Sequence, residues 1–201
     1  MATVMMVELF VNGKFSVKQL FEHVLPVREI KQAYNNYGDT LISEGVCVLL
    51  YELGYGVITY NGGPCIGPFI GASRYLSNFY DVTVTFDNIT YDNSEAAFHA
   101  QKVLDEELRK QFAKLSPRAA KRKGRRVQLR DDWEDVKDDI MYQIVKAKFE
   151  QHPELRDKLR ATDNLKIVEF NTWGDREWGV CDGDGLNKLG KILMRVRDEL
   201  R

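Results

Sequence analysis

The segment SEAAFHAQK, residues 94–102, carries the residue types that acid–base and nucleophilic chemistry require. Four of its side chains are spaced i, i+3, i+4 and i+7, so a helix would place them on one face. They are Glu95, Phe98, His99 and Lys102. A carboxylate and an amine at the two ends of that face could act on one small ligand. A surface glutamate and lysine that flank a buried phenylalanine would give the same spacing.

A second candidate lies in the loop segment TWGDREWG, residues 172–179. It holds Trp173, Asp175 and Trp178. An indole face stacks on a nucleobase with about 1–3 kcal/mol per base, and Asp175 would supply a second carboxylate. The alternative is that both indole rings close the hydrophobic core.

The third candidate is the basic segment PRAAKRKGRR, residues 117–126, in which six of the ten side chains are basic. Arginine side chains can bind phosphate through two parallel hydrogen bonds. Acidic segments at 105–107 and 131–139 flank this run. The run could therefore equally be a solvated face that balances its neighbours.

The composition indicates an ordinary globular protein and excludes several classes. The chain has 201 residues, of which 44% are hydrophobic and 29% charged, and its formal net charge is -1. That charge excludes a histone-like protein that holds nucleic acid by bulk charge, although a local basic face is compatible with it. No apolar run approaches the ~18 residues that a membrane span needs.

The cysteine and histidine positions favour a reducing, cytoplasmic setting and no metal site. The three cysteines, Cys47, Cys65 and Cys181, form no CxxC pair, which argues against a disulfide framework or a zinc knuckle. The three histidines have no metal-binding spacing. The N-terminal segment MATVMMVELF lacks the basic and long apolar regions of a secretion signal.

The pattern of elements predicts an α+β fold in two parts. Residues 1–70 contain 4 basic and 6 acidic side chains and are interpreted as a small N-terminal α/β extension of unknown role. The strands expected there are 7–11, 45–52 and 56–60, and the helices are 15–24 and 28–39. Residues 71–201 form the second part, in which helices predominate.

In the second part the patterns predict one hairpin, several helices and a short strand. VTVTF and ITY, joined by Asp-Asn, predict the hairpin at 82–91. The expected helices run from Glu95 to about Lys114 with a break near Asp105, from Ser116–Pro117 onward, over 131–151, over 152–163 and at the C-terminus. A strand is expected at 166–170. The expected apolar stripes are Trp133, Val136, Ile140, Ile144 and Ala147 on the long helix, and Leu189, Leu193, Val196 and Leu200 on the last.

The order of motifs in the second part resembles the NADAR family, also called YbiA-like N-glycosidases. The segments that carry the resemblance are LSNFY (76–80), SEAAFHAQK (94–102), SPRAAKRKGR (116–125), Trp133 with KxxxM (137–141), KF (148–149), LRAT (159–162), Glu169, Asp175 with WG (178–179), and GLNKLGKILMRVR (185–197). The chain has Ala96 and Ala97 where the family often has the aromatic-rich SEHYFQAQK. The resemblance implies a YbiA-like fold for residues 71–201 and leaves residues 1–70 outside it.

The resemblance also implies an N-glycosidase, a hydrolase that breaks the bond between a ribosyl carbon and an exocyclic base amine. The first substrate that it implies is guanine carrying ADP-ribose in nucleic acid, which the basic segment favours. The alternative is a ribosylamino-pyrimidine phosphate of riboflavin biosynthesis, a small ribosylated base. An alternative of another class is a non-catalytic module that binds DNA or an ADP-ribose or other NAD-derived ligand.

Matching positions gives the site residues that the resemblance implies. Lys102 would attack the sugar carbon to form a Schiff base, assisted by Glu95 in proton transfer. Direct hydrolysis with Glu95 and Asp175 as the two carboxylates is the other route. The expected substrate-binding residues are Ser77, Asn78, Phe79, Arg125 for phosphate, Trp133 and Trp178. Neither route requires a metal or another cofactor, and no membrane association is expected. The sequence leaves protein partners open.

Overall fold

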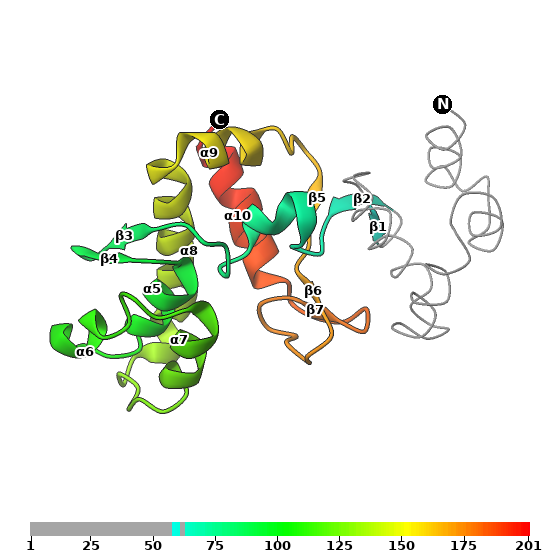
Figure 1. The fold of residues 1–201 in the computed structure, drawn as a ribbon. Coiled ribbons are helices and arrows are strands. Elements are labelled where there is room, and N and C mark those ends of the chain that lie inside the picture. The colour runs from blue at the N-terminus through cyan, green and yellow to red at the C-terminus, as the bar shows by residue number, and fades with distance from the viewer. Residues whose placement is uncertain (1–57, 61–62) are drawn as a thin grey trace.

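The computed structural model describes residues 58–60 and 63–201 (Figure 1). The strands and helices expected before residue 56 lie outside these residues. The expected strand at 56–60 is present as β1 (Ile58–Tyr60), which pairs antiparallel with β2 (Gly63–Ile66). β2 also pairs parallel with β5 (Lys166–Ile167), so the order of this sheet is β1-β2-β5. The expected division after residue 70 stays a prediction.

The expected hairpin forms between β3 (Val84–Phe86) and β4 (Ile89–Tyr91). Asp87 and Asn88 make its turn with φ values of 49° and 61°. Positive φ at both central residues is what a tight two-residue hairpin needs, and Asp and Asn tolerate it better than most residues. Alternation along the strands then buries Val84, Ile89 and Tyr91 against the helices.

The helix that follows is much shorter than the sequence predicts. α5 (Ser94–Ala100) begins at the expected cap, where the Asn93 side chain accepts a hydrogen bond from the amide of Ala96 at 2.8 Å. It ends at Ala100, and α6 (Glu106–Lys110) starts only after a turn. Every residue of α5 is buried. This short helix is therefore an internal element rather than the first half of a long surface helix.

The remaining helices are α7 (Pro117–Gly124), α8 (Trp133–Gln151), α9 (Pro153–Arg160) and α10 (Lys188–Glu199). α7 starts at the expected Ser-Pro cap and packs on α5. α8 contacts α5 and β3 on one side and α10 on the other. In Figure 1 α10 runs through the middle of the molecule, beside α8.

The buried stripe of α8 differs from the predicted one. Trp133 and Ile144 are buried as expected, but Val136, Ile140 and Ala147 are only partly buried. The other buried side chains of the helix are Met141, Tyr142, Val145, Lys148 and Phe149. Because α8 packs against elements on two sides, its buried surface is wider than a single helical stripe. On α10 the expected Leu189, Leu193 and Val196 are buried, and Leu200 is partly buried.

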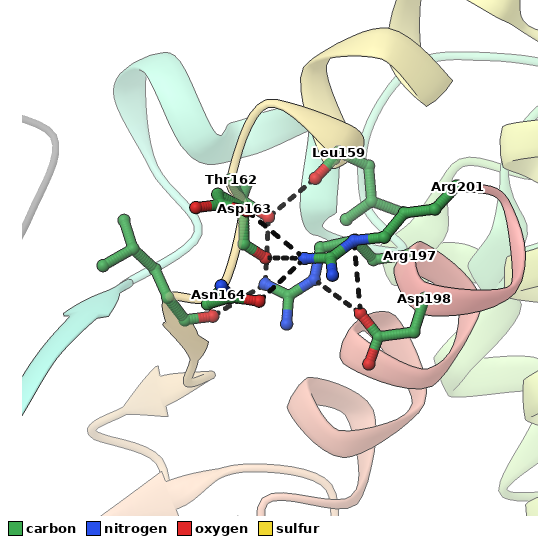
Figure 2. Close-up of polar contacts among 8 residues, drawn as sticks. Leu159, Thr162, Asp163, Asn164, Arg197, Asp198 and Arg201 are labelled. Carbon is green, nitrogen blue, oxygen red and sulfur yellow. Dashed lines mark hydrogen bonds and ion pairs between the residues drawn. The ribbon is translucent and has the colours of Figure 1, made fainter.

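Two arginines of the C-terminal segment fix α10 to the turn between α9 and β5 (Figure 2). Arg197 is buried, and its Nη1 donates to Thr162 Oγ1 at 3.1 Å and to the Leu165 carbonyl at 2.7 Å. Arg201 is exposed and donates to the Asp163 carbonyl at 2.8 Å. The buried arginine therefore holds the last helix against the segment that leads into β5.

The segment after β5 contains two further short strands, β6 (Phe170–Asn171) and β7 (Val180–Cys181), which pair in parallel. The loop 172–179 lies between them, at the lower centre of Figure 1. Six α-helices and seven short strands in the described residues make an α+β fold in which helices predominate, as predicted. No helix in the described part of the chain is long and apolar enough to cross a membrane.

Candidate active site

Glu95 and His99 form a buried pair on α5. Glu95 Oε1 lies 3.0 Å from His99 Nε2, one helical turn away. The backbone amide of Glu95 donates to the Asn78 carbonyl at 3.1 Å, which joins the helix to the loop after η3 (Gly71–Leu76). The imidazole therefore holds the carboxyl group of Glu95 in one orientation.

Lys102 lies in the turn after α5 and is half-buried. Its Nζ donates to the Gly124 carbonyl at 3.3 Å and lies 5.5 Å from the centre of the Trp133 ring. Burial lowers the pKa of Lys102, the Glu95 carboxylate opposes that shift, and Arg125 lowers the pKa further. The structure thus brings Lys102 and Glu95 within electrostatic reach of one another, although α5 ends at Ala100 and Lys102 lies in the turn after it rather than on the expected helix face. The lowered pKa favours the neutral, nucleophilic amine.

Three aromatic rings form a cluster beside α5, and Lys102 contacts one of them. The Phe98 ring centre is 5.2 Å from that of Trp133 and 5.3 Å from that of Trp178, and both contacts are tilted or edge-on. Trp133 is buried and Trp178 is partly buried. The side chain of Trp173 is 65% exposed and lies outside this cluster. The two indoles expected to bind substrate therefore meet at one place and also pack on the core.

The loop 77–79 reaches the same region through Asn78 and Phe79. Asn78 is buried, and its Nδ2 lies 3.2 Å from Met141 Sδ. The Phe79 ring centre is 5.9 Å from Lys121 Nζ. The Ser77 hydroxyl accepts a hydrogen bond from the Phe79 amide at 3.0 Å, so it shapes the loop.

Lys148 holds the start of the loop 77–79 through two hydrogen bonds to backbone carbonyl groups. It is buried on α8, and its Nζ donates to the Tyr75 carbonyl at 2.5 Å and to the Ser77 carbonyl at 2.9 Å. Burial lowers the pKa of Lys148 to about 7. The two carbonyl groups are the natural partners of an amine inside the protein, and the contact fixes the start of the loop 77–79.

Three buried polar atoms around the site have no hydrogen-bond partner among the described residues. They are Asn78 Oδ1, Ser94 Oγ and His99 Nδ1. Buried polar atoms in folded proteins are nearly always paired, and leaving one unpaired costs about 1–3 kcal/mol.

Asp175 shapes the loop that carries Trp178. Its Oδ1 accepts hydrogen bonds from the amides of Glu177 at 3.1 Å and Trp178 at 2.9 Å. The Asn171 side chain bonds both the amide of Asp175, at 3.0 Å, and its carbonyl, at 2.7 Å. The carboxylate is therefore held in a rigid turn beside the indole.

Glu169 is a further carboxyl group at this site, and it is absent from the predicted set. It lies between β5 and β6. The pKa of Glu169 is raised to about 8, first by burial and then by the carboxylates of Asp175 and Glu95, and Lys121 opposes this shift. Its sequence signal is an acid inside the apolar segment KIVEF, at a position that also belongs to the family pattern.

The basic side chains of the segment 117–126 contact different parts of the protein. Lys121 lies beside Phe79 and within electrostatic reach of Lys102 and Glu169. Lys123 is turned away, because its Nζ donates to Gln111 Oε1 at 2.7 Å and lies 4.9 Å from the centre of the Phe112 ring. Arg125 is exposed and within electrostatic reach of Lys102. Lys121 was not in the predicted set, and only the fold separates it from its neighbours.

Within residues 58–60 and 63–201, no group of three or more His, Cys, Asp and Glu side chains could hold a metal ion. The pair of Glu95 and His99 accordingly has no third ligand there. What the site offers is an amine, three carboxyl groups, two indole rings and a basic edge.

Comparisons with known proteins identify the family of the chain. The NADAR domain model matches residues 69–201. N-glycosidase YbiA of Escherichia coli (strain K12) is 44% identical over 129 residues, which are 62% of this chain and 80% of that protein. A riboflavin biosynthesis protein of Vibrio vulnificus is 37% identical over 131 residues, which are 63% of this chain but 35% of that protein.

The fold comparison points the same way. The NMR structure of E. coli YbiA superposes with a TM-score of 0.60 at 40% identity, and the match covers 67% of this chain and 82% of that one. The expected YbiA-like fold is therefore confirmed. The chain belongs to the NADAR domain family and is an N-glycosidase, a hydrolase acting on N-glycosyl compounds.

Proposed function

We propose that this N-glycosidase breaks the bond between ribose C1 and an exocyclic base amine, and that its main substrate is ADP-ribosylated guanine in nucleic acid. The observation that carries the proposal is the half-buried Lys102 amine, which lies against Trp133 and within electrostatic reach of Glu95. An aromatic wall suits a base, and a neutral amine beside a carboxylate suits attack on a sugar carbon.

In the proposed reaction the neutral Lys102 amine forms a bond to C1 while the bond from C1 to the base nitrogen breaks. The electron pair of the broken bond goes to the base nitrogen, which takes up a proton and leaves as a free amine. The sugar ring opens to a Schiff base on Lys102. Water then adds to C1, with Glu95 accepting its proton, and the lysine is released.

The remaining residues have proposed roles in binding. Trp133 and Trp178 stack on the base, and Asn78 with the loop residues Ser77 and Phe79 holds the ribose or the base edge. Asp175 is proposed to act as a carboxylate near C1 in addition to shaping its loop. Arg125 binds a phosphate group.

The preference for a nucleic-acid substrate is supported by the basic edge of the site. Within the described residues, Lys121 Nζ has no ion pair or hydrogen bond, and it lies 5.9 Å from the centre of the Phe79 ring. The Arg125 side chain also has no ion pair or hydrogen bond with another described residue, so the two side chains offer two cations near Lys102. A phosphodiester backbone would occupy such an edge.

The second candidate substrate, a ribosylamino-pyrimidine phosphate, is favoured by the relatives named as riboflavin biosynthesis proteins. Cytoplasmic location belongs to the same proposal.

A paired assay tests the choice of substrate. Purified enzyme is given an oligonucleotide that carries one ADP-ribosylated guanine and, separately, the free ribosylamino-pyrimidine phosphate. We expect a larger kcat/KM for the oligonucleotide, and we expect Lys121→Ala to lower it about 10-fold while its helix neighbour Lys123→Ala leaves it unchanged. Turnover of the small compound alone would contradict the nucleic-acid assignment.

A further inference from the structure

The imidazole of His99 is enclosed, and its two nitrogen atoms have different surroundings. Only 6% of the His99 surface is exposed. Its Nε2 lies 3.0 Å from Glu95 Oε1, and its ring makes an edge-type contact with that of Phe98, with 5.7 Å between the two centres. Its Nδ1 is buried and has no hydrogen-bond partner among the described residues. One nitrogen therefore faces an acceptor, and the other faces none.

Gly124, at the end of α7, closes the Nδ1 side of the ring. A side-chain carbon at position 124 would overlap with His99 Nδ1, so the glycine lies directly against this atom. The carbonyl oxygen of Gly124 is the acceptor for Lys102 Nζ. The glycine therefore fills the space beside Nδ1 with a CH2 group, which offers the ring no hydrogen bond.

These surroundings decide which ring nitrogen carries the proton. A neutral imidazole has one N–H donor and one bare nitrogen, and the partners of the two nitrogens determine which is which. A proton on Nε2 makes the hydrogen bond to Glu95 Oε1. A proton on Nδ1 would be a buried donor without an acceptor, which costs free energy, and the same holds for the second proton of an imidazolium. The contacts of His99 thus select the neutral form with its proton on Nε2.

We propose that His99 is a positioning residue that donates its single ring proton to Glu95 Oε1 and so leaves Glu95 Oε2 to accept the proton of the attacking water. This inference rests on the proposed function and assigns the reacting oxygen within it. Glu95 Oε2 has no hydrogen bond or ion pair with another residue in the described part of the chain. His99 acts only through Glu95 and touches neither the sugar nor the base.

The proposed step is the hydrolysis of the Schiff base on Lys102. The oxygen of water bonds to C1, the C=N electron pair moves to the Lys102 nitrogen, and one proton of the water goes to Glu95 Oε2. The bond from C1 to the lysine nitrogen then breaks with its electron pair on the nitrogen, which takes this proton back from Oε2. The hydroxyl group on C1 becomes the carbonyl group of the opened ribose and loses its proton to solvent. The His99 ring keeps its own proton throughout.

Two amide substitutions at position 99 separate the hydrogen bond from the packing of the ring. A glutamine side chain places an N–H donor near the position of Nε2, whereas an asparagine side chain reaches only as far as Nδ1. Both variants lose the ring contact with Phe98. We expect His99→Gln to keep most of the wild-type kcat. His99→Asn should lower kcat about 100-fold, the size of effect that a small misplacement of a catalytic group produces, with KM nearly unchanged. Equal kcat values for the two variants would overturn the proposal.

A second measurement reads the ring proton in the wild-type protein without any turnover. The imidazole nitrogens are observed by 15N NMR at pH 7, where protonated and bare ring nitrogens give well-separated signals. The His99 signals are assigned through their couplings to the ring C–H protons and checked by their absence in His99→Gln. A protonated Nε2 with a bare Nδ1 supports the proposal. A proton on Nδ1 overturns it and leaves the proposed function intact. Absence of wild-type turnover on both ribosylated bases overturns the proposed function and the role of Glu95 Oε2 with it.

Discussion

Gly124 packs directly against the imidazole ring of His99. A Cβ at position 124 would lie 2.4 Å from His99 Nδ1, which is closer than real Cβ contacts allow. The carbonyl of the same glycine accepts the hydrogen bond from Lys102. The last residue of α7 thus sets the distance between the group that orients Glu95 and the proposed nucleophile.

The first prediction follows from that contact. Gly124→Ala should displace the His99 ring, and with it Glu95, because the ring is enclosed and cannot yield freely. We expect kcat to fall at least 10-fold and the free energy of unfolding to fall by about 1–3 kcal/mol. Enzyme assays and urea unfolding measure the two effects. Introducing Gly124→Ala into a His99→Ala background should cost less stability than in the wild type, because only the contact with the Cβ of residue 99, at 2.9 Å, remains. An equal cost in both backgrounds would show that the clash with the ring is not the cause.

Trp178 and Trp173, the two tryptophans of the loop 172–179, give a matched pair of variants that tests whether Trp178 stacks on the base. Trp178→Ala should raise KM about 10-fold, since base stacking on an aromatic ring is worth about 1–3 kcal/mol. Trp173 is 65% exposed and makes no contact with the Phe98 cluster, so Trp173→Ala should leave KM as it is. Steady-state kinetics on one substrate compare the two variants. Equal effects would contradict the assignment of Trp178 to the base.

Lys148 makes stability depend on pH in a defined window. Burial lowers its pKa from 10.5 to about 7 in the folded protein, so between these values the unfolded chain binds one more proton. The free energy of unfolding should therefore rise with pH above about 7, by at most ~1.4 kcal/mol per pH unit from this group. Lys148→Met should lack this component. Urea unfolding of both proteins at several pH values between 7 and 9 measures the difference, and parallel curves would contradict the prediction.

Arg197 and Arg201, the two arginines of Figure 2, should contribute unequally to the free energy of unfolding. Arg197→Ala leaves Thr162 and the Leu165 carbonyl without their buried donor, so we expect a loss of about 2 kcal/mol or more. Arg201→Ala removes exposed contacts only, and about 0.5 kcal/mol or less is expected. Thermal unfolding of the two variants compares them. A larger effect at Arg201 would show that the C-terminal contact does not depend on burial.

Local signals in the sequence were sufficient for the hairpin and the helix starts. Asp87 and Asn88 carry their turn preference in their own side chains, and Ser116 with Pro117 defines a helix start without help from the rest of the chain. The end of α5 at Ala100 was not predictable in this way. No Gly or Pro stands there, so the sequence carries no local stop signal at the end of this buried helix.

The sequence predicted only part of the site, because some properties of its residues depend on contacts that form only in the fold. Glu95, Lys102, Trp133 and Trp178 have types and spacings that suggest chemistry, and the fold brings them together. Lys121 and Lys123 look alike in a basic run, yet one lies at the site and the other bonds Gln111. Glu169 owes its raised pKa first to burial in the folded protein and then to the carboxylates of Asp175 and Glu95. Properties that arise from such long-range contacts require the structure.

The most direct test is to trap the bond between Lys102 and the sugar. The enzyme is incubated with an ADP-ribosylated guanine oligonucleotide and sodium borohydride, digested and analysed by mass spectrometry. The account predicts a reduced ribosyl adduct on the peptide that contains Lys102, absent from Lys102→Arg and present in the control Lys123→Arg. Continued turnover with no adduct on Lys102 would contradict the Schiff-base route.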